Sequence, residues 1–384
     1  MRRLTTALER GKGRSRPPRL TVVVPVYNTE PFLRSCLDSL LGQSFGDLEA
    51  VVVIDGATDG SLRIAQEYAA RDARIRIHEQ PNAGLGAARN VGAGLAAGEY
   101  LTFLDADDTL PLDAYATMMG TIERTGSDLV VGTLQRDTGG RRTTMPLMRA
   151  NHGSRRERVA LVDMPLMLAD VFAVNKVFRR TFWQRAGLEF PEGLVYEDQP
   201  TLTRAFLAAT HFDVIPETVY WWRIREDQSS LTQRRHEIAD LTDRVESKRI
   251  STRLIAGTEI PGVADVWFKD ILPVDMWEYF RSVPGCSDDY WALLQSAVRE
   301  FWTADTVRFE ETRLPVQQRL MGWLVEHGRR RELEELINFL NARRGDIPVE
   351  SRGELRVALL PGVDDPAVGL PAAVYVLAEH EQRP

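Results

Sequence analysis

The sequence of 384 residues contains few residues that form covalent or metal-rich scaffolds. It has two cysteines, Cys36 and Cys286, and six histidines that are scattered along the chain. This composition excludes a disulfide framework and a site built from cysteine and histidine ligands. Only four of the 48 basic residues are lysines. We attribute this bias to GC-rich coding rather than to a function of arginine.

Long apolar runs and net positive charge are also absent. No run of about 18 apolar residues is present, which excludes a transmembrane helix of ordinary length. The formal net charge is −7. We therefore expect no nucleic-acid partner, because phosphate backbones attract basic surfaces. The composition is that of a globular protein, and the length predicts about two to three domains.

The first 19 residues are basic and poor in apolar side chains, with seven Arg or Lys residues against one acid, Glu9. This composition predicts a disordered tail, which either is simply solvated or touches an anionic membrane surface. No apolar stretch near the start resembles a secretory signal. We expect a cytoplasmic protein, with peripheral contact at the inner face of the plasma membrane as an option for the tail.

After the tail, short apolar runs alternate with segments of helical periodicity. The predicted strands are 20–25, 49–54, 75–78 and 100–104, and the predicted helices are 32–41, 61–70 and 86–97. Strands that are continuous apolar runs are typical of a sheet covered on both faces. The alternation predicts an α/β fold with a doubly wound, mostly parallel sheet.

Composition divides the chain into further regions. We predict an α/β domain over 20–235, a helical region over 236–345 and a small β-like segment over 346–384, which could be incomplete. Within the α/β domain, 139–158 are polar and basic and predict a loop. In the final segment, 373–378 predict a short strand. The tryptophans of the helical region favour core packing, with an oligomer interface or an acceptor-polymer surface as alternatives.

Acidic side chains gather where predicted strands end. Asp105, Asp107 and Asp108 follow the strand at 100–104, and Asp55 follows the strand at 49–54. Three neighbouring carboxylates repel one another unless a cation neutralises them, and their oxygens suit Mg²⁺ or Mn²⁺. The alternative for this cluster is an acidic helix cap. Because ligands bind at the carboxyl ends of strands in open α/β sheets, the acids lie where a site is expected.

Two other segments carry candidate functional residues. Glu197 and Asp198 precede a predicted helix, where a carboxylate either caps the helix or acts as a general base. Further on, Trp222 could stack on a sugar or base, and Arg223 and Arg225 could bind phosphate. A core strand followed by a polar loop is the alternative for this second segment.

Six segments together resemble the inverting glycosyltransferases of family 2, which have the GT-A fold. They are VVVPVYN at 22–28, LDSLLGQSF at 37–45, VVVIDGATDGS at 51–61, NAGLGAARN at 82–90, GEYLTFLDADD at 98–108 and ED at 197–198. The resemblance implies a metal-dependent transfer of a sugar from a nucleotide-diphosphate donor, usually a UDP-sugar, to a hydroxyl group. The cofactor it implies is Mn²⁺ or Mg²⁺.

The resemblance also assigns a nucleotide site. It implies that Pro25, Tyr27 and Asp55 contact the nucleobase and that Arg89 lies near the nucleotide. Most relatives carry two acids where this chain has Ile54 and Asp55. Asp55 corresponds to the second of these acids, which is the one usually assigned to the nucleobase. The loss of the first acid therefore bears on the choice of donor more than on nucleotide binding.

The remaining implied roles concern the reaction itself. Asp105 and Asp107 form the Asp-x-Asp motif, with one facing the ribose and the other the metal, and Asp108 is a further contributor to the metal. Asp198, beside Glu197, would deprotonate the acceptor. The loop that closes over the diphosphate would contain Trp222, Arg223, Arg225, Ser229 and Ser230.

The C-terminal part resembles that of bacterial family members that build teichoic-acid or capsule polymers, which implies a cell-envelope glycan or polyol-phosphate acceptor. One alternative is a nucleotidyltransferase, although the loop PVYNTEP after the first strand lacks the Gly-rich basic sequence of such enzymes. The other is a non-catalytic nucleotide- or sugar-binding module, which intact Asp-x-Asp and Glu-Asp motifs disfavour.

Overall fold

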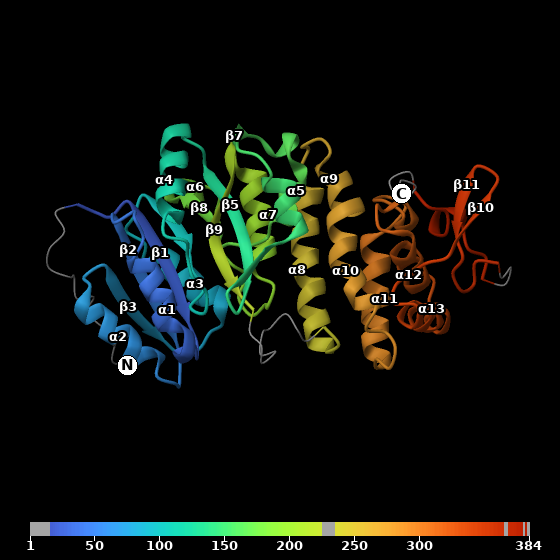
Figure 1. The fold of residues 1–384 in the computed structure, drawn as a ribbon, viewed down its shortest axis with the longest axis horizontal. Coiled ribbons are helices and arrows are strands. Elements are labelled where there is room, and N and C mark those ends of the chain that lie inside the picture. Colours follow the sequence, from blue (N-terminus) through green and yellow to red (C-terminus); the bar gives the residue numbers. More distant parts are fainter. Residues whose placement is uncertain (1–15, 225–234, 365–367, 379–380, 382–384) are drawn as a thin grey trace. The chain divides into compact units, whose positions relative to one another are not determined.

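The computed structural model describes residues 16–224, 235–364, 368–378 and 381. The chain divides into two compact units (Figure 1). The sheet unit contains the chain up to Ala160 together with 172–193 and 208–224. The helical unit contains 161–171, 194–207 and 225–384. Because the chain passes between the two units several times, neither unit is one continuous segment.

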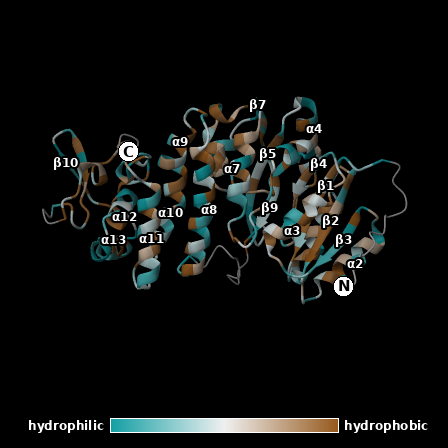
Figure 2. Cartoon of the chain, turned by 180° about the vertical axis from the view of Figure 1, so that it is seen from behind, coloured by the Kyte–Doolittle hydropathy of each residue, from teal (hydrophilic) through white to brown (hydrophobic). Residues whose placement is uncertain are grey.

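Four parallel strands form the first half of the sheet, in the order β3-β2-β1-β4. They are β1 (Leu20–Val26), β2 (Leu48–Asp55), β3 (Ile75–Gln80) and β4 (Tyr100–Phe103). Every residue of β1 and β2 is buried, which explains why these strands need no polar alternation. Figure 2 shows their apolar residues in brown. All four predicted strands are confirmed.

Three helices connect these strands and are also confirmed. They are α1 (Glu30–Leu41), α2 (Ser61–Arg71) and α3 (Leu85–Gly94). Helix α3 is rich in small residues and packs on β1 and β2. At Gly92, an added Cβ would lie 2.2 Å from Cγ1 of Val23. The small residues therefore let α3 approach the sheet closely.

The second half of the sheet is mixed, in the order β4-β8-β5-β9-β7. Its elements are β5 (Leu129–Thr138), β8 (Lys176–Arg179) and β9 (Phe212–Arg223), with helices α4 (Ala114–Thr125) and α6 (Arg180–Arg185). Strand β8 is antiparallel to both β4 and β5, whereas β5 and β9 are parallel. The rings of Phe103, Phe178, Trp183 and Phe190 pack together beside it.

The predicted loop over 139–158 is wrong. The segment contains β6 (Arg141–Thr144), α5 (Pro146–His152) and β7 (Arg156–Val159). Strand β6 forms a hairpin with β5 through Gly139 and Gly140, both at positive φ. Its side chains are mostly exposed and polar, so this strand has no apolar pattern that sequence periodicity could detect.

The helical unit is built mainly from α7 to α13. They are α7 (Asp198–Ala208), α8 (Ile238–Ala256), α9 (Val263–Val266), α10 (Leu272–Phe280), α11 (Asp288–Phe301), α12 (Val316–Glu326) and α13 (Arg330–Ala342). A π-helical turn at Trp267–Ile271 joins α9 to α10. Trp267, Trp302 and Trp323 are 0%, 1% and 7% exposed, which confirms core packing for these three. Trp277 and Trp291 are only half-buried.

The end of the chain contains one antiparallel pair, β10 (Val349–Arg352) and β11 (Leu355–Ala358). The strand predicted over 373–378 is wrong. A short 3₁₀ turn occupies 372–374, and only an isolated bridge joins Val376 to Val357. The proline at 371, which has no N–H, favours such a turn.

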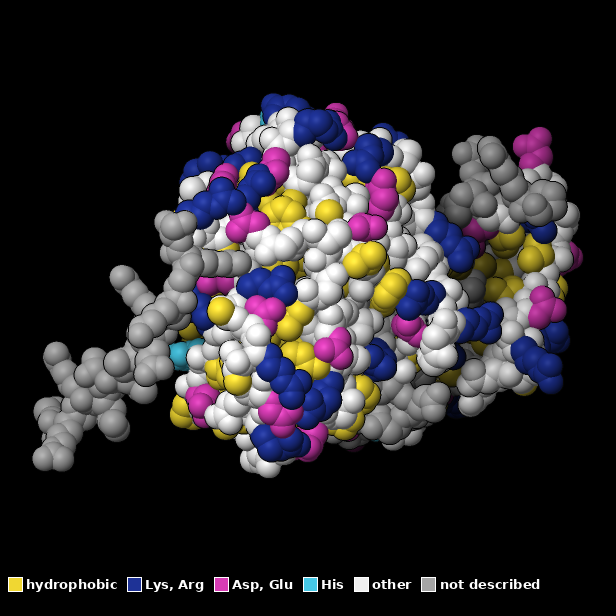
Figure 3. All heavy atoms as spheres, turned by 60° about the vertical axis from the view of Figure 1, so that its left-hand side comes forward, with side chains coloured by type: hydrophobic (Ala, Val, Ile, Leu, Met, Phe, Trp, Pro, Cys, Tyr) yellow, Lys and Arg dark blue, Asp and Glu magenta, His cyan; other side chains and the backbone are white. Residues whose placement is uncertain are grey.

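In the described part of the chain, no helix is long and apolar enough to cross a membrane. Residues 1–15 of the predicted basic tail lie outside that part. On the face seen in Figure 3, basic and acidic side chains lie interspersed. Ion pairs between surface side chains of the described residues include those of Arg34 and Arg63 with Glu67.

Candidate functional site

The loops that follow β1 and β2 are tied together by side chains. Oδ1 of Asn28 accepts a hydrogen bond from the N–H of Thr58 at 2.8 Å. The Glu30 carboxylate accepts one from the N–H of Gly60, also at 2.8 Å. Next to this contact, the Tyr27 side chain is 51% exposed. The loop contacts therefore fix the backbone beside an exposed aromatic ring.

Asp55 is buried at the end of β2, where its carboxylate accepts three hydrogen bonds. The donors are Nε2 of Gln80 at 2.8 Å and the N–H groups of Ala83 at 2.9 Å and Gly84 at 3.0 Å. Asp55 thus holds the loop between β3 and α3 at the strand end. Pro25, predicted beside it at the nucleobase, is buried within β1.

Arg89 and Asp105 form an ion pair between α3 and the end of β4. The Arg89 side chain is 2% exposed, and its Nη2 donates to Oδ1 of Asp105 at 2.8 Å. The guanidinium lies 5.2 Å from the ring centroid of Phe190. The Asp105 side chain remains 30% exposed. The pair therefore orients a carboxylate that solvent, or a ligand, can still reach.

Asp108 is the buried member of the acidic cluster, at 2% exposure. Its Oδ2 accepts from the hydroxyl of Tyr220 and its Oδ1 from the N–H of Arg223, both at 2.7 Å. Burial, followed by the charges of Asp107 and Asp105, raises the pKa of Asp108 well above its usual range. Both oxygens of Asp108 are thus engaged by β9 rather than turned to solvent.

Arg223 also holds the backbone of the Asp-x-Asp segment. Its Nε donates to the carbonyl oxygen of Asp107 at 2.7 Å, and its Nη2 donates to Oγ of Ser35 at 3.2 Å. The guanidinium lies 5.4 Å from the ring centroid of Phe32. Arg223 thus contacts the backbone of Asp107 in this structure, and its role as a phosphate ligand stays a prediction.

The other residues predicted for the diphosphate loop are only partly described. The Trp222 ring lies 5.9 Å from that of Phe172, centroid to centroid, and Arg136 lies over it at 5.3 Å. Arg225, Ser229 and Ser230 lie outside the described residues.

The acidic cluster has the chemistry of a divalent-cation site, but it does not complete one. Its partly exposed members, Asp105 and Asp107, present hard oxygen ligands. Burial, followed by the charges of Asp108, Asp107 and Asp105, raises the pKa of the nearby Cys36 thiol well above its usual range. A cation would relieve this excess negative charge. Among the described residues, no three His, Cys, Asp or Glu side chains are grouped so that they could hold a metal ion.

The Glu197-Asp198 segment belongs to the helical unit, where Asp198 is the first residue of α7. Glu197 is 2% exposed and Asp198 is half-buried. The residue before them, Tyr196, donates its hydroxyl to Oδ1 of Asp240 at 2.8 Å. The carbonyl oxygen of Tyr196 accepts from Oγ of Ser247 at 2.8 Å. Helix α8 therefore holds the N-terminal side of this acidic pair.

A buried lysine holds the other side of the acidic pair. Lys248 is fully buried and donates to Oε1 of Gln199 and to Asp275 of α10. Burial lowers the pKa of Lys248 to about 8, and the charge of Asp275 opposes this effect. The ammonium also lies 5.3 Å from the ring centroid of Trp267.

A second cation, the half-buried Arg244, also supports Tyr196. The guanidinium of Arg244 lies 3.4 Å from the Tyr196 ring centroid, and its Nε donates to the hydroxyl of Tyr279 at 3.3 Å. Tyr279 in turn donates to Oδ2 of Asp240 at 2.7 Å. Sequence reasoning missed all of these supports, since they lie on separate helices without a common motif. The scarcity of lysine was the one available signal for Lys248.

Comparison with known proteins agrees with the sheet topology. Residues 21–184 match the family described as Glycosyl transferase family 2. The chain contains a family 2 glycosyltransferase domain. This domain extends from β1 to α6 and therefore includes the acidic cluster after β4.

Two curated relatives of this glycosyltransferase domain are bacterial. The uncharacterized glycosyltransferase EpsJ of Bacillus subtilis is 34% identical over 228 residues, which are 56% of this chain and 63% of that protein. A poly(ribitol-phosphate) beta-glucosyltransferase of Bacillus spizizenii is 28% identical over 214 residues, which are 54% of this chain and 33% of that protein. The chain thus spans less than two thirds of the length of either relative.

Among solved structures, residues 1–349 of S. aureus TarS, crystallised with UDP-GlcNAc, match with a TM-score of 0.68. The match covers 94% of this chain and 99% of that one at 18% identity. At such low identity the likeness concerns the fold alone. It confirms the predicted GT-A fold, with C-terminal helices following the glycosyltransferase domain.

Proposed function

We propose that this chain transfers a sugar from a UDP-sugar to a hydroxyl group, with inversion at the anomeric carbon and with Mn²⁺ or Mg²⁺ as cofactor. The proposed acceptor is a polyol-phosphate polymer or another cell-envelope glycan. The observation that carries the proposal is the acidic segment after β4, in which buried Arg89 orients Asp105 and β9 holds Asp108. In a family 2 domain, this arrangement supports a donor site at the carboxyl ends of the strands.

Within this site we assign the cation to Asp107 rather than to Asp108. Asp107 is half-exposed, whereas both oxygens of Asp108 already accept hydrogen bonds from Tyr220 and Arg223. A bound divalent cation would neutralise charge on the departing diphosphate. We propose that Asp105 faces the ribose and that the exposed Tyr27 ring stacks on the nucleobase.

The proposed base is Asp198, with Glu197 beside it. As the acceptor oxygen bonds to the anomeric carbon and the bond to the diphosphate breaks, a base must take the acceptor's proton. The anchors of Tyr196 and Gln199 on both sides of the acidic pair support this role, because a well-positioned base loses little freedom in the transition state. A fixed base suits a single displacement without a protein nucleophile.

Two of the matched proteins support the donor and the acceptor. The TarS structure contains UDP-GlcNAc, and the name of the Bacillus spizizenii relative specifies poly(ribitol-phosphate) as its acceptor. By analogy we propose UDP as the nucleotide and a polyol phosphate as the acceptor class.

The test measures UDP release by the purified chain with UDP-glucose or UDP-GlcNAc, Mn²⁺ and poly(ribitol phosphate), and determines the anomeric configuration of the product by NMR. Removal of the cation with EDTA should abolish transfer. Full activity in EDTA would contradict the metal requirement. Release of diphosphate from UTP would instead indicate a nucleotidyltransferase.

Replacing the base gives the sharper test. We expect Asp198→Ala to lower kcat by about 10²- to 10⁴-fold, the usual contribution of general acid–base catalysis. Affinity for UDP, measured by calorimetry, should stay within a few-fold of the wild type. Glu192→Ala, which removes an exposed acid of a nearby loop, is the matched control. Unchanged turnover in Asp198→Ala would refute the assignment.

A further inference from the structure

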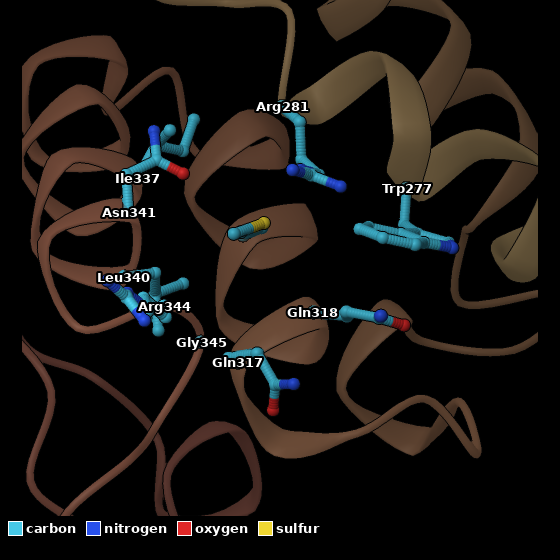
Figure 4. Close-up of a pocket in the computed structure, with 10 residues that line it drawn as sticks. Trp277, Arg281, Gln317, Gln318, Ile337, Leu340, Asn341, Arg344 and Gly345 are labelled. Carbon is cyan, nitrogen blue, oxygen red and sulfur yellow. The ribbon is translucent and has the colours of Figure 1, made fainter.

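The helical unit contains a cavity that is lined by none of the residues assigned above to sugar transfer. Its volume is about 440 Å³, which is within the range of small-molecule sites. Residues from α10, α12 and α13, and from the turn after α13, line it (Figure 4). Three distant segments of the chain thus meet at one opening.

The lining includes one pair of residues four positions apart from each of α12 and α13, and a third pair from the end of α10 and the residue after it, so each pair lies on one face of its helix. These pairs are Trp277 and Arg281, Gln317 and Met321, and Ile337 and Asn341. Figure 4 shows the side chains of Trp277 and Arg281 extending into the space between the helices. The guanidinium of Arg281 lies 5.4 Å from the ring centroid of Trp277, which holds its charge at the cavity.

The lining is positively charged, although the whole chain has a net charge of −7. It contains two arginines, three side-chain amides and no carboxylate; the polar members are Arg281, Arg344, Gln317, Gln318 and Asn341. In the described part of the chain, no hydrogen bond or ion pair joins these five side chains to another group. By contrast, Arg330 and Arg331 of α13 pair with Glu334 and Glu335.

The backbone at Arg344 is unusual. Arg344 has a φ of 54° and is followed by Gly345 at 84°, where α13 ends. The N–H of Gly345 donates to the carbonyl oxygen of Leu340 at 2.8 Å. Helices commonly end in a left-handed residue, which is usually a glycine, so an arginine in this conformation carries a conformational cost. The helix end therefore carries an arginine to the cavity at some conformational cost.

We propose that this cavity binds an anionic carbohydrate, namely a sugar phosphate or a polyol phosphate. Arg281 and Arg344 suit the phosphate, since guanidinium groups form paired, charge-assisted hydrogen bonds with its oxygens. The three amides can both donate to and accept from hydroxyl groups. Met321, Ile337 and Leu340 offer apolar contact for the carbon skeleton. This binding site does not depend on the proposed sugar transfer.

The test is calorimetry of the full chain with glucose 6-phosphate, glucose and inorganic phosphate. Glucose 6-phosphate should bind most tightly, because it alone offers both hydroxyls and a phosphate. Arg281→Gln and Arg344→Gln should each weaken its binding by about tenfold or more. Arg343→Gln removes the same charge from an exposed neighbour outside the lining, and should change binding by less than about twofold.

The same polyol-phosphate chemistry occurs in lipid headgroups, so a second arm uses vesicles of phosphatidylglycerol and of phosphatidylcholine. If the chain sediments with phosphatidylglycerol vesicles and Arg281→Gln abolishes this sedimentation, the ligand is a lipid headgroup. If the chain binds glucose 6-phosphate but not the vesicles, the ligand is a free sugar phosphate. The absence of saturable binding in both arms overturns the proposal. An equal loss in Arg343→Gln also overturns it, because diffuse charge would then explain the binding.

Discussion

The sheet unit and the helical unit hold their acidic residues by different means. After β4, three aspartates stand within four residues, and hydrogen bonds from Tyr220, Arg223 and Arg89 hold them. At the start of α7, Glu197 and Asp198 are held indirectly, through the residues on either side of them. Buried charged side chains of other helices, above all Lys248, bond to those flanking residues. In the first case the supports bond to the aspartates themselves, whereas in the second they hold the neighbouring residues. The acids of both sites are visible in the sequence, but most of their supports come from distant parts of the chain.

This difference predicts different consequences of mutation. After β4, Asp105 and Asp107 remain partly exposed, so replacing either should alter chemistry more than stability. The Lys248 ammonium is buried, so water cannot take the place of the groups to which it donates. Breaking these contacts should therefore destabilise the fold. The following predictions test this contrast, from the largest expected effect to the smallest.

At the strand end, Asp107→Asn removes a charge at the proposed cation site without changing the side chain's size. We expect kcat to fall by about 10³-fold, since electrostatic stabilisation of the leaving group is lost. The melting temperature should stay close to that of the wild type, because Asp107 is half-exposed. Asp113→Asn, at an acid that contacts Ser44, is the control and should remain active. A large fall in stability in Asp107→Asn would break the comparison.

In the helical unit, Lys248→Met should lower the free energy of unfolding by about 3 kcal/mol, because it leaves Asp275 without its cation and Gln199 without its donor. Urea denaturation measures this loss. Lys269→Met removes the same charge from a more exposed pair with Asp265 and should change stability by less than about 1 kcal/mol. Equal effects of the two substitutions would show that burial of Lys248 is unimportant.

The pH dependence of stability sharpens the same test. Burial lowers the pKa of Lys248 from 10.5 to about 8 in the folded state. Between these values the unfolded chain binds the proton more tightly than the folded chain. The free energy of unfolding should therefore rise with pH across this window, relative to that of Lys248→Met. A constant difference between wild type and variant from pH 8 to pH 10.5 would contradict the lowered pKa.

The smallest effect should come from Tyr220→Phe, which removes the hydroxyl that donates to Asp108. Leaving a buried carboxylate with one donor fewer should cost about 1–2 kcal/mol of stability. The pKa of Asp108, already raised by burial, should rise further, so the loss should increase as the pH rises and the carboxylate ionises. Tyr27→Phe, at an exposed ring, is the stability control and should unfold like the wild type. An identical stability of the two variants would contradict the role of Tyr220.

Part of this molecule could be predicted from sequence because its signals are local. Strands β1 and β2 are continuous apolar runs, and three aspartates stand within four residues of sequence just after β4. Strand β6 could not be predicted, since its exposed polar residues become a strand only by pairing with β5. The two units also interleave along the chain, with 161–171 and 194–207 in the helical unit, and composition alone does not reveal such crossings.

The amino-acid sequence by itself determined the βαβ order, the family and the identity of the acids at the strand ends, because these depend on neighbouring residues. Only the tertiary structure decided which of those acids stay accessible. Asp105 remains half-exposed beside Arg89, and Asp108 is buried against Tyr220, a residue 112 positions away. The anchoring of the Glu197-Asp198 segment by Lys248 is likewise a tertiary property. Hydrogen bonds between distant segments form only after the chain has folded, and burial then gives chemically identical side chains different proton affinities.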